Sequence, residues 1–228
     1  MTTRGLAMVT GASRGIGAAT AAALSDRYDV LLAGRDRKAL EQRAAEIPGA
    51  RPLPFELTDP VAAADAVTGL SRVDLLVHCA GVGGIGPLDE TSAERWRLTL
   101  EVNVVAVAEL TRLLLPALRA ARGHVVLVNS GQGRNPSAGW GAYAASKFAL
   151  RAYADVLRAE EAASGLLVTT VYPGRTDTDM QRGVRAAEGG EYQPERYLRP
   201  ESVAGAIVTA VTAPADAHLT EMVIRPTG

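Results

Sequence analysis

The sequence is poor in cysteine, in aromatic residues and in long hydrophobic runs. Its one cysteine, Cys79, cannot form an intramolecular disulfide, and the N-terminal run MTTRGLAMVTGAS has no long apolar core followed by a cleavage site. The most tempting apolar stretch, LTRLLLPALRAA, is too short to span a bilayer and is interrupted by Arg112, Pro116 and Arg119. These absences predict a soluble protein of the reducing cytoplasm with no membrane partner.

The chain also lacks an excess of charge of either sign. It has 24 basic and 25 acidic residues, so no overall field draws it to nucleic acid or to an anionic surface. We therefore expect a small neutral molecule as partner and no nucleic acid. His78, His124 and His218 have no neighbouring cysteine or carboxylate at the spacing of a metal site, so we predict no catalytic metal.

Apolar runs of strand length alternate along the chain with alanine-rich segments of helix length. This alternation is typical of βαβ units, and 228 residues fit one domain spanning 1–228. We expect a three-layer, doubly wound α/β Rossmann fold, with a mainly parallel sheet of about seven strands and helices on both faces. The predicted strands are 6–10, 29–33, 51–55, 73–78, 124–129, 166–172 and 221–224. The predicted helices are 16–25, 36–45, 60–70, 92–122, 143–163 and 201–211, and the polar stretch 176–200 is predicted to be a mobile flap over a pocket.

A glycine-rich motif, T-G-A-S-R-G-I-G at 10–17, follows the first strand and opens the first helix. Gly11 permits a tight turn, Gly15 lets the backbone approach a pyrophosphate, and Gly17 allows close packing of helix and strand. The free N–H groups and the positive dipole end of the helix would stabilise the phosphates. The spacing departs from G-x-G-x-x-G, so an ordinary glycine-rich turn between strand and helix remains an alternative.

The end of the second predicted strand bears on the choice of cofactor. An NAD site commonly has a carboxylate there, but LLAGRD has Gly34 followed by Arg35, and Arg14 lies in the glycine motif. Two guanidinium groups suit the 2′-phosphate of NADP, so NADP(H) is the predicted cofactor. Asp36 either caps the next helix, which we prefer, or reaches the ribose and leaves NAD(H) possible.

Three polar residues could carry chemistry. Ser130 follows the strand HVVLVN, and Tyr143 and Lys147 in YAASK lie one turn apart on one face of a helix. A lysine ammonium about 4 Å from the phenol is worth on the order of 4 kcal/mol at a dielectric of 20, or about 3 pKa units before desolvation. This predicts a Tyr143 pKa near neutrality, with Ser130 bonded to a substrate oxygen. Taken alone, the YxxxK spacing favours a surface lysine beside a core-facing tyrosine.

Over essentially its whole length the chain resembles the compact, single-domain type of short-chain dehydrogenase/reductase. The resemblance rests on TGASRGIG, on CAG at 79–81, on Asn103 in EVNVVAVAELT, on Ser130 with Tyr143 thirteen positions later, on Lys147, and on PG at 173–174. It implies an oxidoreductase that moves hydride between NADP(H) and a carbonyl or alcohol. In that family pattern Tyr143 is the general acid/base, Ser130 binds the substrate oxygen, Lys147 holds the nicotinamide ribose and acidifies the phenol, and Asn103 supports a water-linked proton relay. From the residues alone, Asn103 is a capping or kink residue in a long helix.

The resemblance also implies the cofactor contacts and the assembly, a homodimer or homotetramer. The implied cofactor-binding residues are Gly11, Ser13, Arg14, Gly15, Ile16, Gly17, Arg35, Glu56, Leu57, Cys79, Ala80, Gly81, Asn103, Tyr143, Lys147, Pro173, Gly174, Thr176 and Thr178. The chain departs from the family pattern at Glu56, at His78 and Cys79, and at Arg175 and Thr176.

Other residues near the expected site carry weaker hypotheses. Asp59 lies in the stretch expected to border the adenine, but a role as the cap of the next helix is equally consistent with the sequence. Cys79 is expected to be a small buried residue rather than a nucleophile. Gln132, Trp140, the loop 82–88 and the flap around Met180 are candidates for a substrate pocket. A catalytically silent NADP(H)-binding regulator or scaffold remains the alternative function, because a fold alone does not establish an activity.

Overall fold

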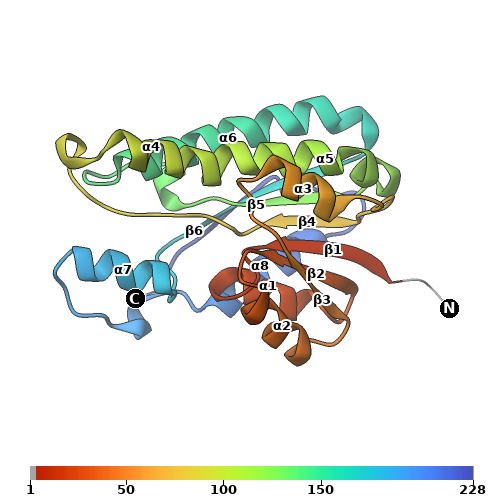
Figure 1. Cartoon of the computed structure of the whole chain (residues 1–228), viewed down its shortest axis with the longest axis horizontal. Coiled ribbons are helices and arrows are strands. Elements are labelled where there is room, and N and C mark those ends of the chain that lie inside the picture. The colour runs from red at the N-terminus through yellow and green to blue at the C-terminus, as the bar shows by residue number, and fades with distance from the viewer. Residues whose placement is uncertain (1–3, 228) are drawn as a thin grey trace.

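The computed structural model describes residues 4–227, so positions 1–3 and 228 of the predicted domain lie outside the described residues. Figure 1 shows three layers, with a sheet between two layers of helices. The strands are β1 (Gly5–Thr10), β2 (Tyr28–Gly34), β3 (Ala50–Pro54), β4 (Leu75–His78), β5 (His124–Val128), β6 (Leu167–Pro173) and β7 (Glu221–Ile224). Each predicted strand is found within a few residues of its expected position.

The sheet is doubly wound, as predicted. Its order is β3-β2-β1-β4-β5-β6-β7, and every neighbouring pair is parallel. The chain proceeds outward from β1 first to one side and then to the other, so the order reverses between β1 and β4. Thr10 pairs with His78 in that register, which places the glycine motif beside the segment after β4. Ligands of open α/β sheets bind in the crevice at such a switch point.

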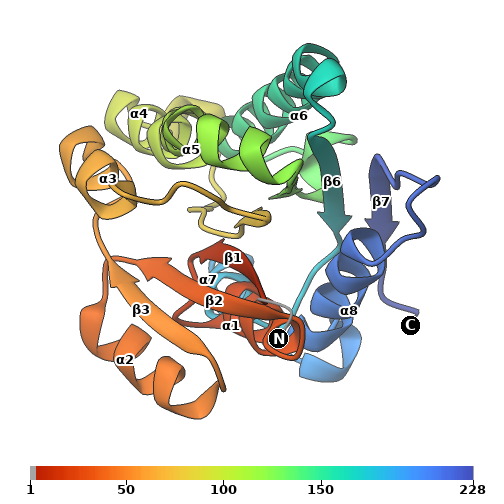
Figure 2. The same cartoon turned by 90° about the vertical axis from the view of Figure 1, so that its right-hand side faces the viewer.

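Helices cover both faces of the sheet (Figure 2). One face carries α1 (Gly15–Leu24), α2 (Arg37–Glu46) and α8 (Pro200–Val211), which contribute Leu24, Leu40 and Ile207 to one buried apolar cluster. The other face carries α3 (Pro60–Val67), α5 (Ala106–Ala121) and α6 (Gly141–Glu161), with Leu114 and Leu150 in a second cluster. The central strands are buried on both sides, which explains their nearly continuous apolar sequences.

Helix capping follows the sequence closely. The Asp36 carboxylate accepts a hydrogen bond from the Ala39 amide at 3.1 Å, so the preferred interpretation of Asp36 as a cap is confirmed. Asp59 caps α3 in the same way, accepting from the amides of Val61 and Ala62. Both carboxylates therefore accept hydrogen bonds from the backbone of the helix that follows them. None of the helices in the described part of the chain is both long and apolar enough to cross a membrane.

The predicted single helix 92–122 is wrong in one respect. The chain stays helical but divides into α4 (Ala93–Leu100), a wider π-helical segment η2 (Glu101–Val105) and α5. Asn103 lies at the centre of η2. Single π-turns inside α-helices occur frequently at functional sites, because the extra residue changes the direction of one side chain.

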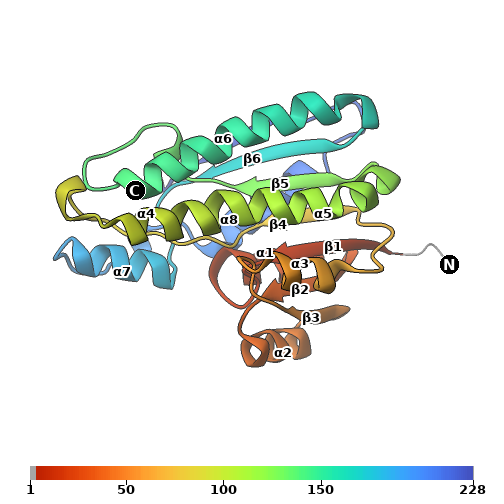
Figure 3. The same cartoon turned by 45° about the horizontal axis from the view of Figure 1, so that its top comes forward.

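The stretch 176–200, predicted to be an aperiodic flap, contains regular structure. It holds α7 (Asp179–Ala187) and a 3-10 turn, η5 (Pro194–Arg196), and a parallel bridge joins Thr176 to Leu198 at its base. Figure 3 shows α7 at the end of the molecule opposite the start of β1. Gln181 and Val184, three positions apart, form its buried side. The prediction missed this helix because charged and small residues surround its short buried face.

Candidate active site

The glycine motif forms a turn that leaves donors free at the start of α1. Gly11 and Gly15 have φ angles of +65° and +56°, a region that side chains rarely adopt. A Cβ at Gly17 would lie 2.3 Å from the Gly11 carbonyl oxygen, so only glycine fits there. No side chain caps the first turn of α1 among the described residues. This turn therefore fits a pyrophosphate, which the first N–H groups would bind.

Thr10 fastens the glycine motif to the segment after β4. Its hydroxyl oxygen accepts hydrogen bonds from the amides of Cys79 and Ala80, at 3.2 and 3.1 Å. A Cβ at Gly11 would lie 2.9 Å from the Ala80 backbone, so the two segments pack at backbone contact. Burial raises the pKa of the Cys79 thiol to about 12, which keeps it protonated. Thr10 was in the quoted motif but was not predicted as a site residue, since this contact depends on the sheet register.

The two arginines proposed for the 2′-phosphate form weak surface ion pairs. Arg14 lies 3.2 Å from the Asp179 carboxylate, and Arg35 lies 3.9 Å from that of Glu56, with side chains 73% and 81% exposed. Exposed pairs of this kind are worth about 0–1 kcal/mol, so both guanidinium groups can exchange their partners for a phosphate. Glu56 also accepts from Thr58.

The remaining residues of the predicted cofactor set occupy different places. Leu57, expected to border the adenine, packs against the core cluster on the α5 side of the sheet. Thr178 caps α7, accepting from the Gln181 amide, and its methyl group lies opposite Gly15. Thr176 is buried and donates to the Gly174 carbonyl. The backbone of Ser13 accepts a long hydrogen bond from Arg43.

Ser130, Tyr143 and Lys147 meet at the carboxyl end of β5. Tyr143 and Lys147 come from the first two turns of α6 and are 8% and 4% exposed, while Ser130 follows the strand. The Lys147 ammonium donates to the Val128 carbonyl at 3.0 Å, and its Nζ lies 5.7 Å from the centre of the Tyr143 ring. Burial lowers the pKa of Lys147 to about 8. The alternative of a surface lysine does not hold.

The phenol of Tyr143 is less acidic in this structure than the sequence predicted. That prediction assumed a lysine ammonium about 4 Å from the phenol. Burial instead raises the Tyr143 pKa above its usual value, and a hydrogen-bonding contact with Ser130 works in the opposite direction. The prediction failed because the four-residue spacing places both side chains on one helix face but does not fix the position of the ammonium. The Lys147 ammonium instead donates to the Val128 carbonyl of the neighbouring strand.

Asn103 holds the loop after β4. Its Oδ1 accepts from the Val82 amide, and its Nδ2 donates to the Val82 carbonyl and to the Ser146 hydroxyl, all within 3.0 Å. Gly81 lies directly beneath, where a Cβ would be 3.2 Å from Oδ1. Asn103 therefore positions the cofactor-side loop from within the π-turn.

A cleft joins these elements above the ends of β5 and β6. It is lined by Ile16, Asn129, Ser130, Gly131, Gln132, Trp140, Tyr143, Pro173, Gly174, Arg175, Thr176, Thr178, Met180, Gln181 and Val184. The expected pocket residues Gln132, Trp140 and Met180 are among them, and a Cβ at Gly83 of the 82–88 loop would lie 3.0 Å from the sulfur of Met180. Gln181 and Val184 were missed, because the segment that carries them was treated as irregular.

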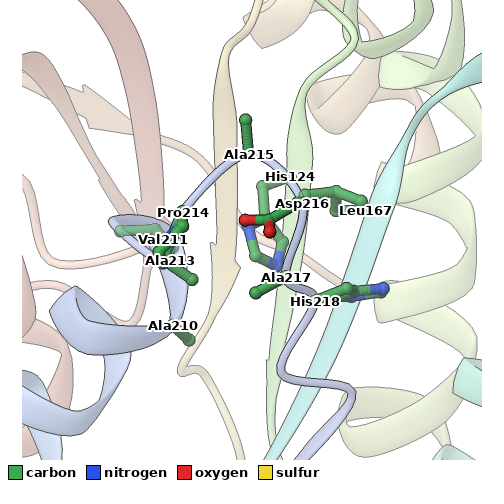
Figure 4. Close-up of a pocket in the computed structure, with 10 residues that line it drawn as sticks. All are labelled: His124, Leu167, Ala210, Val211, Ala213, Pro214, Ala215, Asp216, Ala217 and His218. Carbon is green, nitrogen blue, oxygen red and sulfur yellow. The ribbon is translucent and has the colours of Figure 1, made fainter.

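A second hollow lies at the opposite end of the sheet, where β5 and β6 begin (Figure 4). His124 and His218 line it, with rings 5.8 Å apart and edge to face. His124 Nε2 is hydrogen-bonded to the Thr169 hydroxyl at 2.8 Å, and His218 Nε2 to the Val168 carbonyl at 3.1 Å. Within residues 4–227, no three histidine, cysteine, aspartate or glutamate side chains are grouped so that they could hold a metal ion.

Comparison with known proteins gives consistent results. A family model described as short chain dehydrogenase matches residues 5–189. Glycine betaine reductase ATRR of Emericella nidulans is 35% identical over 97% of this chain, which spans 18% of the length of that protein. An uncharacterized oxidoreductase of Staphylococcus haemolyticus is 31% identical, with 97% of this chain and 96% of the relative covered.

Solved structures resemble the fold throughout. A metagenomic short-chain oxidoreductase in complex with NADP has a TM-score of 0.83 and 31% identity, covering 98% of each chain. An actinorhodin polyketide ketoreductase with NADPH has a TM-score of 0.90 and 25% identity, covering 99% of this chain and 98% of its own. A ketoacyl reductase from Brucella melitensis complexed with NADH, at 21% identity, has the same fold.

Proposed function

The chain belongs to the short-chain dehydrogenase/reductase family, and from that premise we propose that it transfers hydride between NADP(H) and a carbonyl or alcohol carbon of a small molecule. The observation that carries the proposal is the cleft lined by Ser130, Tyr143 and Ile16 of the glycine motif. The buried Lys147 lies behind it, with its Nζ 5.7 Å from the centre of the Tyr143 ring. An NADP-bound relative at 31% identity supports the choice of cofactor. The single cysteine fits a reducing cytoplasm.

The chain offers a place for each charged part of the cofactor. The first N–H groups of α1 would bind the pyrophosphate, and Gly15 allows its close approach. Arg14 and Arg35 would exchange Asp179 and Glu56 for the 2′-phosphate. When bound, NADPH supplies the hydride, or NADP accepts it.

Polar residues in and beside the cleft would transfer the proton that accompanies the hydride. Tyr143 donates it to the substrate oxygen during reduction and accepts it during oxidation, while the Ser130 hydroxyl bonds the same oxygen. The buried ammonium of Lys147 stabilises negative charge on the phenol as the proton leaves, and its two remaining N–H donors are available for the ribose. Asn103 acts indirectly by holding the loop at Val82.

The same proposal covers the organisation of the molecule. One sheet contributes both the glycine turn and the catalytic cleft, which supports a single domain. Exposed apolar side chains on the π-turn and on α6, namely Val105, Phe148 and Val156, support a homodimer or homotetramer.

The proposal is tested by cofactor binding followed by turnover. Titration with NADPH and NADH measures affinity, and consumption of NADPH is then followed against a panel of ketones and aldehydes. We expect tighter binding of NADPH and consumption with part of the panel. Tight binding without consumption on a broad panel would instead identify a silent NADP(H)-binding regulator.

A further inference from the structure

Gln181 has an unsatisfied donor in the wall of the cleft. The residue lies in the first turn of α7, is 7% exposed, and lines the cleft together with Tyr143 and Trp140. Its Nε2 is buried and has no hydrogen-bond partner within residues 4–227. The hydroxyls of Thr20 and Thr170 are in the same state, but neither lines the cleft. Buried donors are normally paired, so the free amide of Gln181 indicates a partner that the chain itself does not supply.

A second glutamine of the same cleft shows the contrast. The Oε1 of Gln132 accepts from the Ser137 amide at 2.9 Å, and its Nε2 donates to the Ser137 hydroxyl at 3.3 Å. Gln132 therefore stabilises its own loop. Of the two glutamine amides in the cleft, the one on α7 is left available to a ligand.

The surroundings of Gln181 favour a neutral and largely apolar ligand. Trp140 and Met180 line the same cleft, and the Trp140 and Tyr143 rings are 5.5 Å apart. Arg175 is the nearby cation on this wall, but it donates two hydrogen bonds to Glu188. That guanidinium holds the pKa of the Glu188 carboxyl at about 2, so both groups stay ionised and paired with each other. A carboxylate ligand could bind Arg175 only by replacing Glu188.

We propose that the Gln181 amide donates a hydrogen bond to a second, uncharged oxygen of the substrate. The inference rests on the proposed function and narrows its substrate class to apolar carbonyl compounds with another acceptor, such as keto esters. A simple ketone would enter the cleft but leave the Gln181 donor unpaired, and a binding site discriminates strongly against a ligand that leaves its polar groups unpaired.

The test compares two compounds of equal length, ethyl benzoylacetate and hexanophenone, which differ in the ester group. Their dissociation constants are measured by titration with NADPH bound, in a Tyr143→Phe background where turnover does not interfere. The Gln181→Met variant keeps the length of the side chain and removes its donor. Gln193→Met makes the same change in the same segment, outside the cleft. We expect the parent protein to prefer the keto ester by about tenfold, Gln181→Met to remove the preference, and Gln193→Met to retain it.

Three outcomes would overturn the inference. The first is equal or undetectable affinity of the Tyr143→Phe protein for both compounds, and the second is an unchanged preference when Gln181→Met is added. The third is a loss of NADPH affinity on adding Gln181→Met, which would assign Gln181 to the cofactor. Failure of the proposed function gives a different result. In that case the wild-type protein binds the keto ester with the expected preference but consumes no NADPH.

Discussion

The two hollows of this molecule lie at opposite ends of one sheet and differ in the state of their polar groups. At the amino ends of β5 and β6, the Thr169 hydroxyl donates to the Leu219 carbonyl, so His124 Nε2 must donate to Thr169. His218 likewise donates to a carbonyl. Each bond there joins two strands or a strand to the C-terminal segment. In the cleft at the carboxyl ends, by contrast, the buried Nε2 of Gln181 has no hydrogen-bond partner within residues 4–227.

The difference shows that concavity alone does not identify a functional site. A hollow whose donors and acceptors are matched within the chain is part of the structure, whereas a buried polar group without a partner in the wall of a cleft indicates a ligand. If this is correct, changes in the cleft should alter turnover and binding without unfolding the protein. Changes in the His124 hollow should alter stability and leave the cleft unaffected.

The largest effect is expected for Tyr143→Phe. Removing the hydroxyl removes the proton donor, and general acid/base catalysis contributes about 10²- to 10⁴-fold, so kcat should fall by about 10³-fold. The dissociation constant of NADPH should change little. Steady-state kinetics and a cofactor titration measure the two effects, and retention of most of the turnover would refute the assigned role.

The second effect concerns the hollow and pH. Burial lowers the pKa of His124 to about 4 from the 6.5 of a free histidine, so the unfolded chain binds this proton more readily. The free energy of unfolding is therefore fully retained above pH 6.5 and decreases as the pH falls toward 4. The contribution of His124 to that loss is about 3 kcal/mol.

Urea unfolding at pH 7 and at pH 4 compares the wild-type protein with His124→Gln, whose amide can still donate to Thr169. The variant should lose about 3 kcal/mol less between the two pH values, and NADPH affinity at pH 7 should not change. The same pH dependence in both proteins would contradict the prediction. His78, with its pKa lowered to about 3 by burial, contributes equally to both proteins and cancels in the comparison.

The third effect is on the choice of cofactor. Arg35→Ala removes a charge-assisted hydrogen bond to the 2′-phosphate, so NADPH should bind about 10- to 100-fold more weakly while NADH is little affected. Arg37→Ala is the matched control, since Arg37 is a similarly exposed arginine that forms a surface pair with Glu41 at 3.9 Å. Equal losses for NADPH and NADH would show that Arg35 does not read the phosphate.

Much of the fold could be predicted from the sequence because its signals are local. The apolar runs are the buried strands, and Asp36 and Asp59 are the N-cap residues directly before α2 and α3. The residues alone predicted that Asn103 caps or kinks a long helix, but they did not predict a π-turn, since the residues on both sides continue a helical pattern. The helix α7 was missed because its buried face consists of Gln181 and Val184 within a charged segment.

The residues of the candidate site could be predicted better than their contacts. Motif order brought Ser130, Tyr143 and Lys147 into one hypothesis, but the ammonium bonds to Val128, a partner set by tertiary packing. The free donor of Gln181 has no sequence signal at all. Whether an amide is paired depends on every neighbour in the folded chain, and the side-chain nitrogen and oxygen of Gln132 each form a hydrogen bond with Ser137.

The central claim is that the cleft transfers hydride with Tyr143 as the proton donor. The most direct measurement uses NADPH that carries deuterium at its reactive ring carbon, incubated with a substrate from the carbonyl panel and followed by mass spectrometry of the alcohol. The account predicts deuterium in the product of the wild-type protein and only a small fraction of that yield from Tyr143→Phe in the same time. Deuterium transfer at equal rates by the two proteins, or an alcohol formed without the label, would contradict it.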